Sequence, residues 1–166
     1  DVEHQAGLKG LRVAAKKGLG VVIMEPLRGG NLAKNPPPSA IADLFATSAH
    51  DWTPANWGLQ WIWDQPEVSL LLSGMTTLEQ VEQNLESASR SGIGTLSDAD
   101  CSLLAKAREV YKTLAPIPCT QCEYCLPCPN GVEIPQIFEL FNEGHQFENQ
   151  PDAQRRYRGF IKPENR

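Results

Sequence analysis

Four of the chain's five cysteines, Cys119, Cys122, Cys125 and Cys128, lie in one short stretch, each three positions after the last. Two cysteines with two residues between them can direct both sulfur atoms at one metal. A disulfide framework usually links distant segments of a small secreted domain, whereas any bridge inside this stretch would close a very small loop. Residues 1–20 also lack the apolar core of a signal peptide. The spacing therefore predicts a metal centre.

Zinc and an iron–sulfur cluster are the two candidate metal centres. Zinc sites with four thiolates usually take two Cys-x2-Cys pairs from segments about fifteen to twenty residues apart. A contiguous run suits a larger cluster, and bacterial ferredoxins carry Cys-x2-Cys-x2-Cys-x3-Cys-Pro. This chain matches the first three cysteines and the final proline, Pro129, but its last gap holds two residues, Leu126 and Pro127. We expect a 4Fe-4S cluster on the four cysteines, with zinc as the alternative.

The composition is that of an ordinary soluble globular protein, with 41% hydrophobic and 21% charged residues. The net charge of −5 argues against a nucleic-acid partner. A basic cluster at residues 155–158 is expected to be a solvated surface segment. No apolar run reaches the length of a membrane span. We therefore expect a cytoplasmic protein with no nucleic-acid or membrane partner.

Two short apolar runs, residues 20–26 and 68–74, predict strands. Both are continuous rather than alternating, which is typical of strands buried on both faces of a parallel sheet. Helical patterns follow each run, and this βα alternation implies parallel strands covered by helices. Two strands cannot bury both faces of a sheet. We therefore expect the chain to be part of a larger α/β architecture or to self-associate.

Helix boundaries are marked by capping residues. Thr53 before Pro54 is typical of a helix start, Ser39 is a plausible N-cap, and Ser97 with Asp100 resembles a capping box. Cys101 follows on that last helix and is expected to be partly buried and inert. Leu78, Val81 and Leu85 form an apolar stripe, and Trp57 and Trp61 are expected to be packing anchors. The predicted helices cover residues 5–17, 39–49, 53–65, 77–90 and 96–115.

Three blocks in series resemble the C-terminal half of iron–sulfur-containing aldo/keto reductases. They are GLGVVIMEPLRGGNLA (18–33), VSLLLSGMTTLEQVEQN (68–84) and CTQCEYCLPCPNGVEIP (119–135). The resemblance covers nearly the whole chain. It implies an α/β, helix-rich fold that is the last part of a (β/α)8 TIM barrel, with strands seven and eight in the first two blocks. Residues 1–115 would be barrel, and 116–166 an incomplete 4Fe-4S ferredoxin-like extension.

The same resemblance implies a site for NADP or NAD. The turn after strand seven would lie against the pyrophosphate, the turn after strand eight would bind phosphate at a helix N-terminus, and the following helix would contact the adenosine. The turn after strand eight holds no basic residue for a 2′-phosphate, so both cofactors remain candidates. An ordinary glycine turn is the alternative for the first segment. The implied residues are Pro26, Leu27, Arg28, Gly29, Gly30, Ser73, Gly74, Thr76, Gln80, Gln83 and Asn84.

The implied activity is carbonyl reduction or alcohol oxidation by an NAD(P)-dependent oxidoreductase, with the cluster adding electron transfer. In that family the catalytic aspartate, tyrosine, lysine and histidine belong to the N-terminal half of the barrel. No segment here matches those motifs, so we assign no catalytic residue and expect this chain alone to be inactive. A small-molecule carbonyl and an electron-transfer partner would serve the intact enzyme. An iron–sulfur electron-transfer or interaction module, or a zinc-stapled structural module, remains an alternative.

Overall fold

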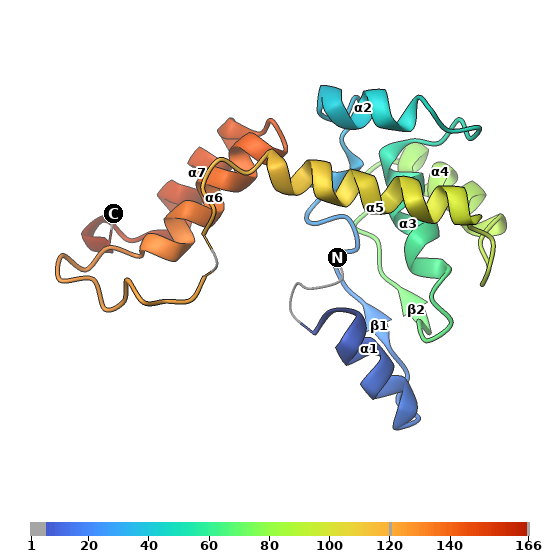
Figure 1. Ribbon diagram of the computed structural model, residues 1–166, viewed down its shortest axis with the longest axis horizontal. Helices are drawn as coiled ribbons and strands as arrows, with labels where there is room; N and C mark the ends of the chain where they lie inside the picture. The colour runs from blue at the N-terminus through green and yellow to red at the C-terminus, as the bar shows by residue number, and fades with distance from the viewer. Residues whose placement is uncertain (1–5, 120, 166) are drawn as a thin grey trace. The chain divides into compact units, whose positions relative to one another are not determined.

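A computed structural model describes residues 6–119 and 121–165 (Figure 1). Within this part of the chain, helices are far more abundant than strands, as the sequence predicts. The elements in order are α1 (Gly7–Lys16), β1 (Val22–Ile23), the 3₁₀ turn η1 (Asn31–Ala33), α2 (Ser39–Phe45), α3 (Pro54–Trp63), β2 (Leu70–Leu71), α4 (Leu78–Ser89), α5 (Asp98–Thr113), α6 (Ile134–Gln146), α7 (Gln150–Phe160) and the 3₁₀ turn η2 (Pro163–Asn165).

The chain divides into two compact units. One comprises Asp1–Asn35 and Ser48–Ser102, and the other comprises Pro36–Thr47 and Leu103–Arg166. The division falls within α5, whereas the sequence-based boundary lies after residue 115 and marks an expected change of function. That functional boundary stays a prediction. No helix among the described residues has the length and apolar character needed to span a membrane.

The first unit contains a parallel pair of strands, one from each predicted apolar run (Figure 1). Val22 of β1 lies opposite Leu70 of β2, and the Leu72 N–H donates to the Ile23 carbonyl at 3.0 Å. Val22 is 54% exposed and Leu70 is 50% exposed, which agrees with the expectation that two strands alone do not bury both faces of a sheet. A pair of strands cannot cover its own faces. The described residues form no further strand, and the barrel assignment remains a prediction.

Helix α3 forms the centre of the first unit. It begins as predicted, with Thr53 Oγ1 accepting from the Asn56 N–H at 3.2 Å and Pro54 at the first helical position. Trp57 is buried, which confirms it as a packing anchor, while Trp61 is half-buried. The amide of Gln60 is buried as well. Its Nε2 donates to the Ser87 carbonyl of α4 at 2.6 Å and to the Ser87 hydroxyl at 3.1 Å, so a polar contact joins the two helices.

Helix α4 lies where the sequence predicts a helix, but most of its apolar stripe is not buried. Leu78 and Leu85 of the apolar stripe are 74% and 66% exposed. The buried position of α4 is Ser87, held by Gln60 of α3. Asn84, one turn earlier, is half-buried and bonded to Ser73. Because Asn84 and Ser87 form the inner face of the helix, Leu78 and Leu85 are turned toward solvent, while Val81 is half-buried.

Two other local predictions are wrong. Ser39 is not an N-cap, because α2 begins at Ser39 and the extended Pro38 (φ −48°, ψ 141°) takes the capping position without a side-chain bond. Cys101 is exposed rather than partly buried. The buried face of α5 carries Asp100, Leu103 and Ala107, and Cys101 lies off this face because successive helical residues are about 100° apart.

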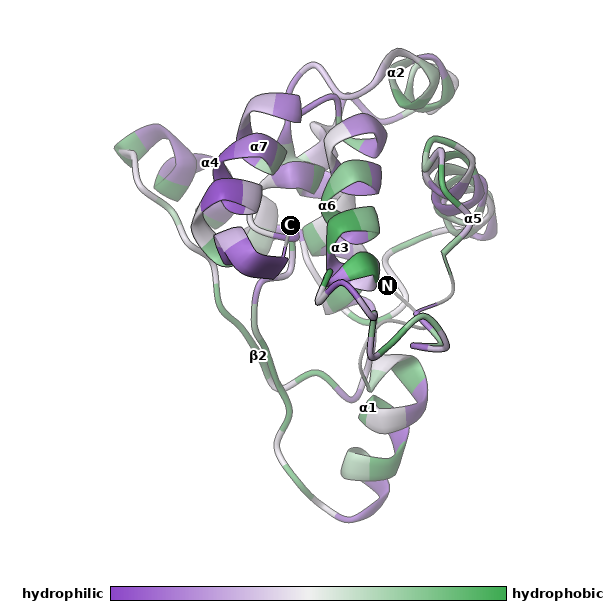
Figure 2. Ribbon diagram, turned by 90° about the vertical axis from the view of Figure 1, so that its left-hand side faces the viewer, coloured by the Kyte–Doolittle hydropathy of each residue, from purple (hydrophilic) through white to green (hydrophobic). Residues whose placement is uncertain are grey.

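The second unit contains a hairpin of two helices. Asn149 N–H, in the turn between α6 and α7, donates to the Gly144 carbonyl at 2.8 Å. Glu143 of α6 forms an ion pair with Arg156 of α7. Figure 2 shows that α7 is largely hydrophilic, whereas α6 carries more apolar residues. The basic cluster at 155–158 lies on α7; Arg155 is exposed, as expected, and Arg156 is half-buried.

Candidate functional site

The four-cysteine segment lies in an irregular stretch between α5 and α6, and its two ends are held to the second unit. At the start, the Ile117 N–H donates to Asn142 Oδ1 at 2.9 Å, and Asn142 Nδ2 donates to the Ile117 carbonyl at 2.8 Å. At the end, the Glu133 N–H donates to the Asn165 carbonyl of η2 at 3.0 Å. The segment is therefore a loop with fixed ends. We call residues 118–132 the cysteine loop.

The backbone of the cysteine loop turns between its cysteines. Gln121 and Glu123 have φ values of 53° and 60°, a left-handed conformation that is uncommon for residues other than glycine. The Leu126 N–H donates to the Glu123 carbonyl at 2.8 Å, and the Gly131 N–H donates to the Cys128 carbonyl at 2.9 Å. These turns give the loop a curled path.

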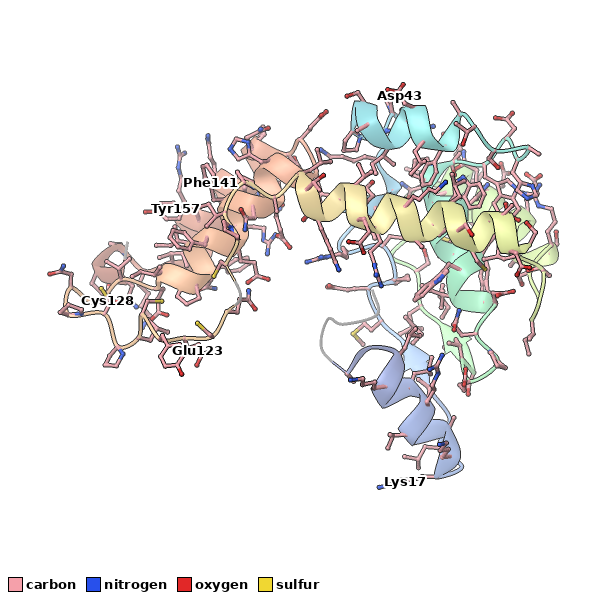
Figure 3. All side chains as sticks on the ribbon, viewed as in Figure 1. Lys17, Asp43, Glu123, Cys128, Phe141 and Tyr157 are labelled. Carbon is pink, nitrogen blue, oxygen red and sulfur yellow. The ribbon has the colours of Figure 1, made fainter. Side chains whose placement is uncertain are left out.

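The thiols of the loop lie at or near its surface, and Figure 3 shows the sulfur atoms along it. Cys122 and Cys125 are exposed, while Cys119 and Cys128 are half-buried. Across residues 6–119 and 121–165, no three His, Cys, Asp or Glu side chains lie close enough together to hold a metal ion. The structure therefore places the four predicted ligands on one loop without gathering their sulfur atoms.

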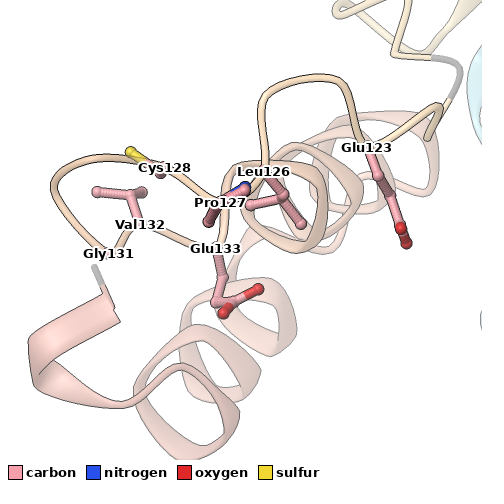
Figure 4. A pocket seen from close by; sticks show the side chains of 7 residues that line it. All are labelled: Glu123, Leu126, Pro127, Cys128, Gly131, Val132 and Glu133. Atoms are coloured by element: carbon pink, nitrogen blue, oxygen red, sulfur yellow. The ribbon is translucent and has the colours of Figure 1, made fainter.

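An open hollow of about 380 Å³ lies beside the last cysteine (Figure 4). Cys128 contributes to its lining, whereas the other three cysteines do not. The hollow is therefore not the predicted metal site, because only one of the four predicted ligands lines it. Its lining combines two carboxylates with apolar side chains and consists of Glu123, Leu126, Pro127, Cys128, Gly131, Val132 and Glu133.

The donor set fits an iron–sulfur cluster or zinc by its chemistry. Thiolates are soft ligands that select these centres over magnesium or calcium. Cys119, Cys125 and Cys128 carry free thiols, so no disulfide removes them from the set. A metal centre here would draw the sulfur atoms together between the fixed ends of the loop, and its binding would be coupled to ordering of the loop.

The predicted nucleotide turns follow the two paired strands. Pro26 comes three residues after the end of β1, and Ser73 comes two residues after the end of β2. Because β1 and β2 are parallel with Ile23 opposite Leu71, their carboxyl ends meet at the same edge. Ligands of α/β sheets bind at this edge. The structure therefore brings both predicted turns to one end of the strand pair.

The turn after β1 is tightly wound. Its N–H groups bond back within the turn, from Arg28 to Glu25 at 3.1 Å and from Gly30 to Leu27 at 3.1 Å. Arg28, Gly29 and Gly30 have φ values of 51°, 61° and 89°, which glycine adopts without strain. A Cβ atom added at either glycine would meet nothing within 4 Å. The glycines therefore serve the turn's conformation and leave open space beside the backbone.

The turn after β2 forms a hydrogen-bonded network with α4. Gln80 Oε1 accepts from the Thr76 N–H at 2.8 Å and from the Thr76 hydroxyl at 3.3 Å. Asn84 Nδ2 donates to the Ser73 hydroxyl at 3.1 Å. Gln83 does not join this network, because its amide donates to Glu79 at 3.0 Å. Four of the predicted residues are therefore joined in two separate pairs, Thr76 with Gln80 and Ser73 with Asn84, and Gln83 belongs to neither.

The turn after β1 is fixed by contact with α3. A Cβ atom added at Gly58 of α3 would lie 2.7 Å from a Leu27 methyl carbon, so the absence of a side chain at Gly58 makes room for Leu27. The Leu27 side chain therefore packs against α3. A contact with the proposed ligand would come from the Leu27 backbone. The sequence placed Leu27 in the predicted site without indicating this partner.

A cluster that sequence reasoning missed lies at the start of α5. His50 Nε2 lies 3.4 Å from Asp100 Oδ2, and the His50 ring stacks on Trp52 at 4.1 Å between centroids. The Ser97 hydroxyl donates to the same Asp100 oxygen at 2.6 Å. The Asp100 carboxylate lies between Ser97 and His50. The imidazole of His50 therefore does not contact the Ser97 hydroxyl, as it would have to do to activate that hydroxyl as a nucleophile. The cluster caps α5 through Ser97 and Asp100.

Burial of the Asp100 carboxyl raises its pKa, but the hydrogen bonds from Ser97 and the nearby His50 outweigh burial, so the net shift of the pKa is downward. The Cys101 thiol next in the chain has a raised pKa, through partial desolvation and then through Asp64, Asp98 and Asp100. A raised pKa disfavours the reactive thiolate. Although exposed, the Cys101 thiol is therefore less readily deprotonated than an ordinary cysteine.

Comparison of the chain with protein-family models, with curated proteins and with solved structures finds no match in any of the three.

Proposed function

We propose that this chain is part of an NAD(P)-dependent oxidoreductase of the iron–sulfur aldo/keto reductase type, with a 4Fe-4S centre in the cysteine loop. The observation that carries the proposal is the parallel pairing of β1 and β2. It supports the resemblance because two turns, 43 residues apart between Gly30 and Ser73, follow the same edge of one strand pair. A barrel would place its ligand-binding loops at that edge.

In this proposal Cys119, Cys122, Cys125 and Cys128 hold the cluster, which supplies electron transfer. The turn after β1 presents backbone and open space to the cofactor's pyrophosphate, and Arg28 adds positive charge. Thr76, with its N–H and hydroxyl, offers two donors for phosphate once the Gln80 amide moves aside. The substrate of the intact enzyme is a small carbonyl compound.

The proposal assigns hydride transfer to residues outside this chain. The 166-residue chain is therefore expected to show no carbonyl reduction with NADPH or NADH, whereas measurable turnover would contradict the assignment. It also places the protein in the cytoplasm, with an electron-transfer partner. The exposed apolar strand pair leads us to expect self-association of the isolated chain, which sedimentation velocity measures.

A pair of cysteine variants tests the metal centre. Cys125→Ser removes one proposed ligand, and Cys101→Ser removes an exposed thiol outside the loop. After anaerobic reconstitution with ferrous iron and sulfide, we expect Cys125→Ser to lose most of the visible absorbance and Cys101→Ser to retain it. Equal absorbance in both variants, or none in the parent chain, would contradict the iron–sulfur proposal.

A zinc-stapled structural module is the second candidate. The observation that favours it is the anchoring of both loop ends to the second unit, through Asn142 and Asn165, because a structural zinc ion supplies folding energy to a small helical region. In that case the purified chain is colourless and contains about one zinc ion.

A further inference from the structure

The start of the cysteine loop is governed by three hydrogen bonds that converge on Ile117. The Ile117 N–H donates to Asn142 Oδ1 at 2.9 Å, and its carbonyl accepts from Asn142 Nδ2 at 2.8 Å. The same carbonyl accepts from the Cys119 N–H at 2.8 Å. Asn142 is therefore joined to the backbone of the first cysteine through one shared carbonyl group.

We infer that Asn142 is a positioning residue for the metal centre: by fixing Ile117 it sets the backbone of Cys119, and it thereby controls how tightly the cysteine loop holds its metal. This inference rests on the proposed metal centre. Asn142 itself carries no ligand atom of the thiolate set. It acts from α6, a regular helix, onto a loop that has no regular structure of its own.

The physical reason is the cost of ordering. A loop that closes around a metal must give up conformational freedom, and each residue fixed beforehand reduces that cost at the moment of binding. The two bonds from Asn142 fix Ile117 in both its donor and its acceptor, and Asn142 is half-buried. Groups that orient metal ligands typically change metal affinity by about 10- to 100-fold when they are removed.

Gln146 provides a matched control within the same helix. It lies one turn after Asn142 on α6, is also half-buried, and its Nε2 donates to the Tyr111 carbonyl at 2.6 Å. Both amides thus attach the chain that precedes the loop to α6. Only the Asn142 contact, of these two, reaches the backbone of a cysteine. Loss of either should weaken the attachment of this preceding chain to α6, but loss of Gln146 should leave Cys119 in place.

The test uses the full chain and the variants Asn142→Leu, Asn142→Asp and Gln146→Leu. Each is reconstituted anaerobically with ferrous iron and sulfide, and the loss of visible absorbance is followed after addition of an iron chelator. Thermal unfolding without metal is measured alongside. Asn142→Asp keeps the acceptor for the Ile117 N–H and loses the donor to its carbonyl, so it isolates the bond shared with Cys119.

We expect both Asn142 variants to lose iron about tenfold faster than the parent chain, and Gln146→Leu to lose it at the parent rate, even where the three variants unfold at similar temperatures. Equal rates of loss in Asn142→Leu and Gln146→Leu would overturn the positioning role while leaving the metal centre standing. A parent chain that takes up neither iron nor zinc would overturn the proposed centre, and with it the role of Asn142.

Discussion

At the scale of single residues, the hydroxyl groups of Thr53 and Ser97 cap helix starts, whereas that of Ser39, also predicted as a cap, does not. Thr53 and Ser97 accept from N–H groups three residues later, as their sequence contexts predict, and Thr77 does the same for α4. Each such cap stabilises its helix because it satisfies an N–H group that has no partner within the helix. Its removal typically costs about 1 kcal/mol.

The carboxyl of Asp100 makes stability depend on pH. Its pKa is lowered in the folded chain, so its contribution is present above the unfolded-state pKa of about 3.9 and is lost as the pH falls through the folded-state pKa. We expect Asp100→Asn to be less stable than the parent chain near neutral pH. The gap should begin to narrow as the pH falls below about 4, and it should close only below the lowered pKa of the folded-state carboxyl.

Urea unfolding at a series of pH values measures this gap. Asp98→Asn is the control, because Asp98 is an exposed residue at the start of the same helix. A gap for Asp100→Asn that stays constant from neutral pH into the acid range would contradict the assignment of the pKa shift to the folded state.

At the scale of elements, the positions of α1 to α5 and of both strands were predictable, whereas α6 and α7 were not among the predicted helices. The packing of the predicted elements was less predictable than their positions. Helix α1 ends as its sequence predicts: Gly18, with a φ of 70°, and Leu19 donate to the carbonyls of Ala15 and Ala14, as in a Schellman motif. The exposed stripe of α4 was not predictable, because the contact that orients α4 is polar. Gln60 and Ser87 meet through hydrogen bonds, and apolar periodicity carries no signal for such a pair.

The hairpin of α6 and α7 depends on a glycine at its closest approach. A Cβ atom added at Gly144 would lie 3.0 Å from the Ala153 Cβ, so a large side chain must separate the helices. We expect Gly144→Leu to lower the free energy of unfolding by about 1–3 kcal/mol. Chemical denaturation followed by circular dichroism measures this change.

The matched control is Gly159→Leu in α7, where an added Cβ atom meets nothing within 4 Å. That change should be neutral or slightly stabilising, because leucine is a better helix former than glycine. If Gly144→Leu were as well tolerated as Gly159→Leu, close packing at Gly144 would not hold the hairpin together.

At the scale of the whole molecule, the sequence indicated where the candidate sites lie but not how complete they are. The register of β1 and β2 brings the two nucleotide turns to one edge, as two parallel strands require. The sulfur atoms of the cysteine loop are not gathered in the described residues, and spacing alone could not reveal this. Asn142 and Ile117 are 25 residues apart in the sequence, and no local sequence pattern indicates that residues at this distance are hydrogen-bonded.

Self-association of the isolated chain is expected from the apolar surface around its strand pair. Val22 and Met24 around β1, and Leu70 and Leu72 around β2, are large apolar residues left exposed. A parallel strand pair with open edges is a template for further pairing.

The metal content of the anaerobically purified chain is the most direct test of the proposed function. Elemental analysis combined with acid-labile sulfide determination should find about four iron atoms and four sulfides per chain, the content of one 4Fe-4S cluster. About one zinc ion per chain and no sulfide would contradict the iron–sulfur centre and establish a zinc-stapled module in its place.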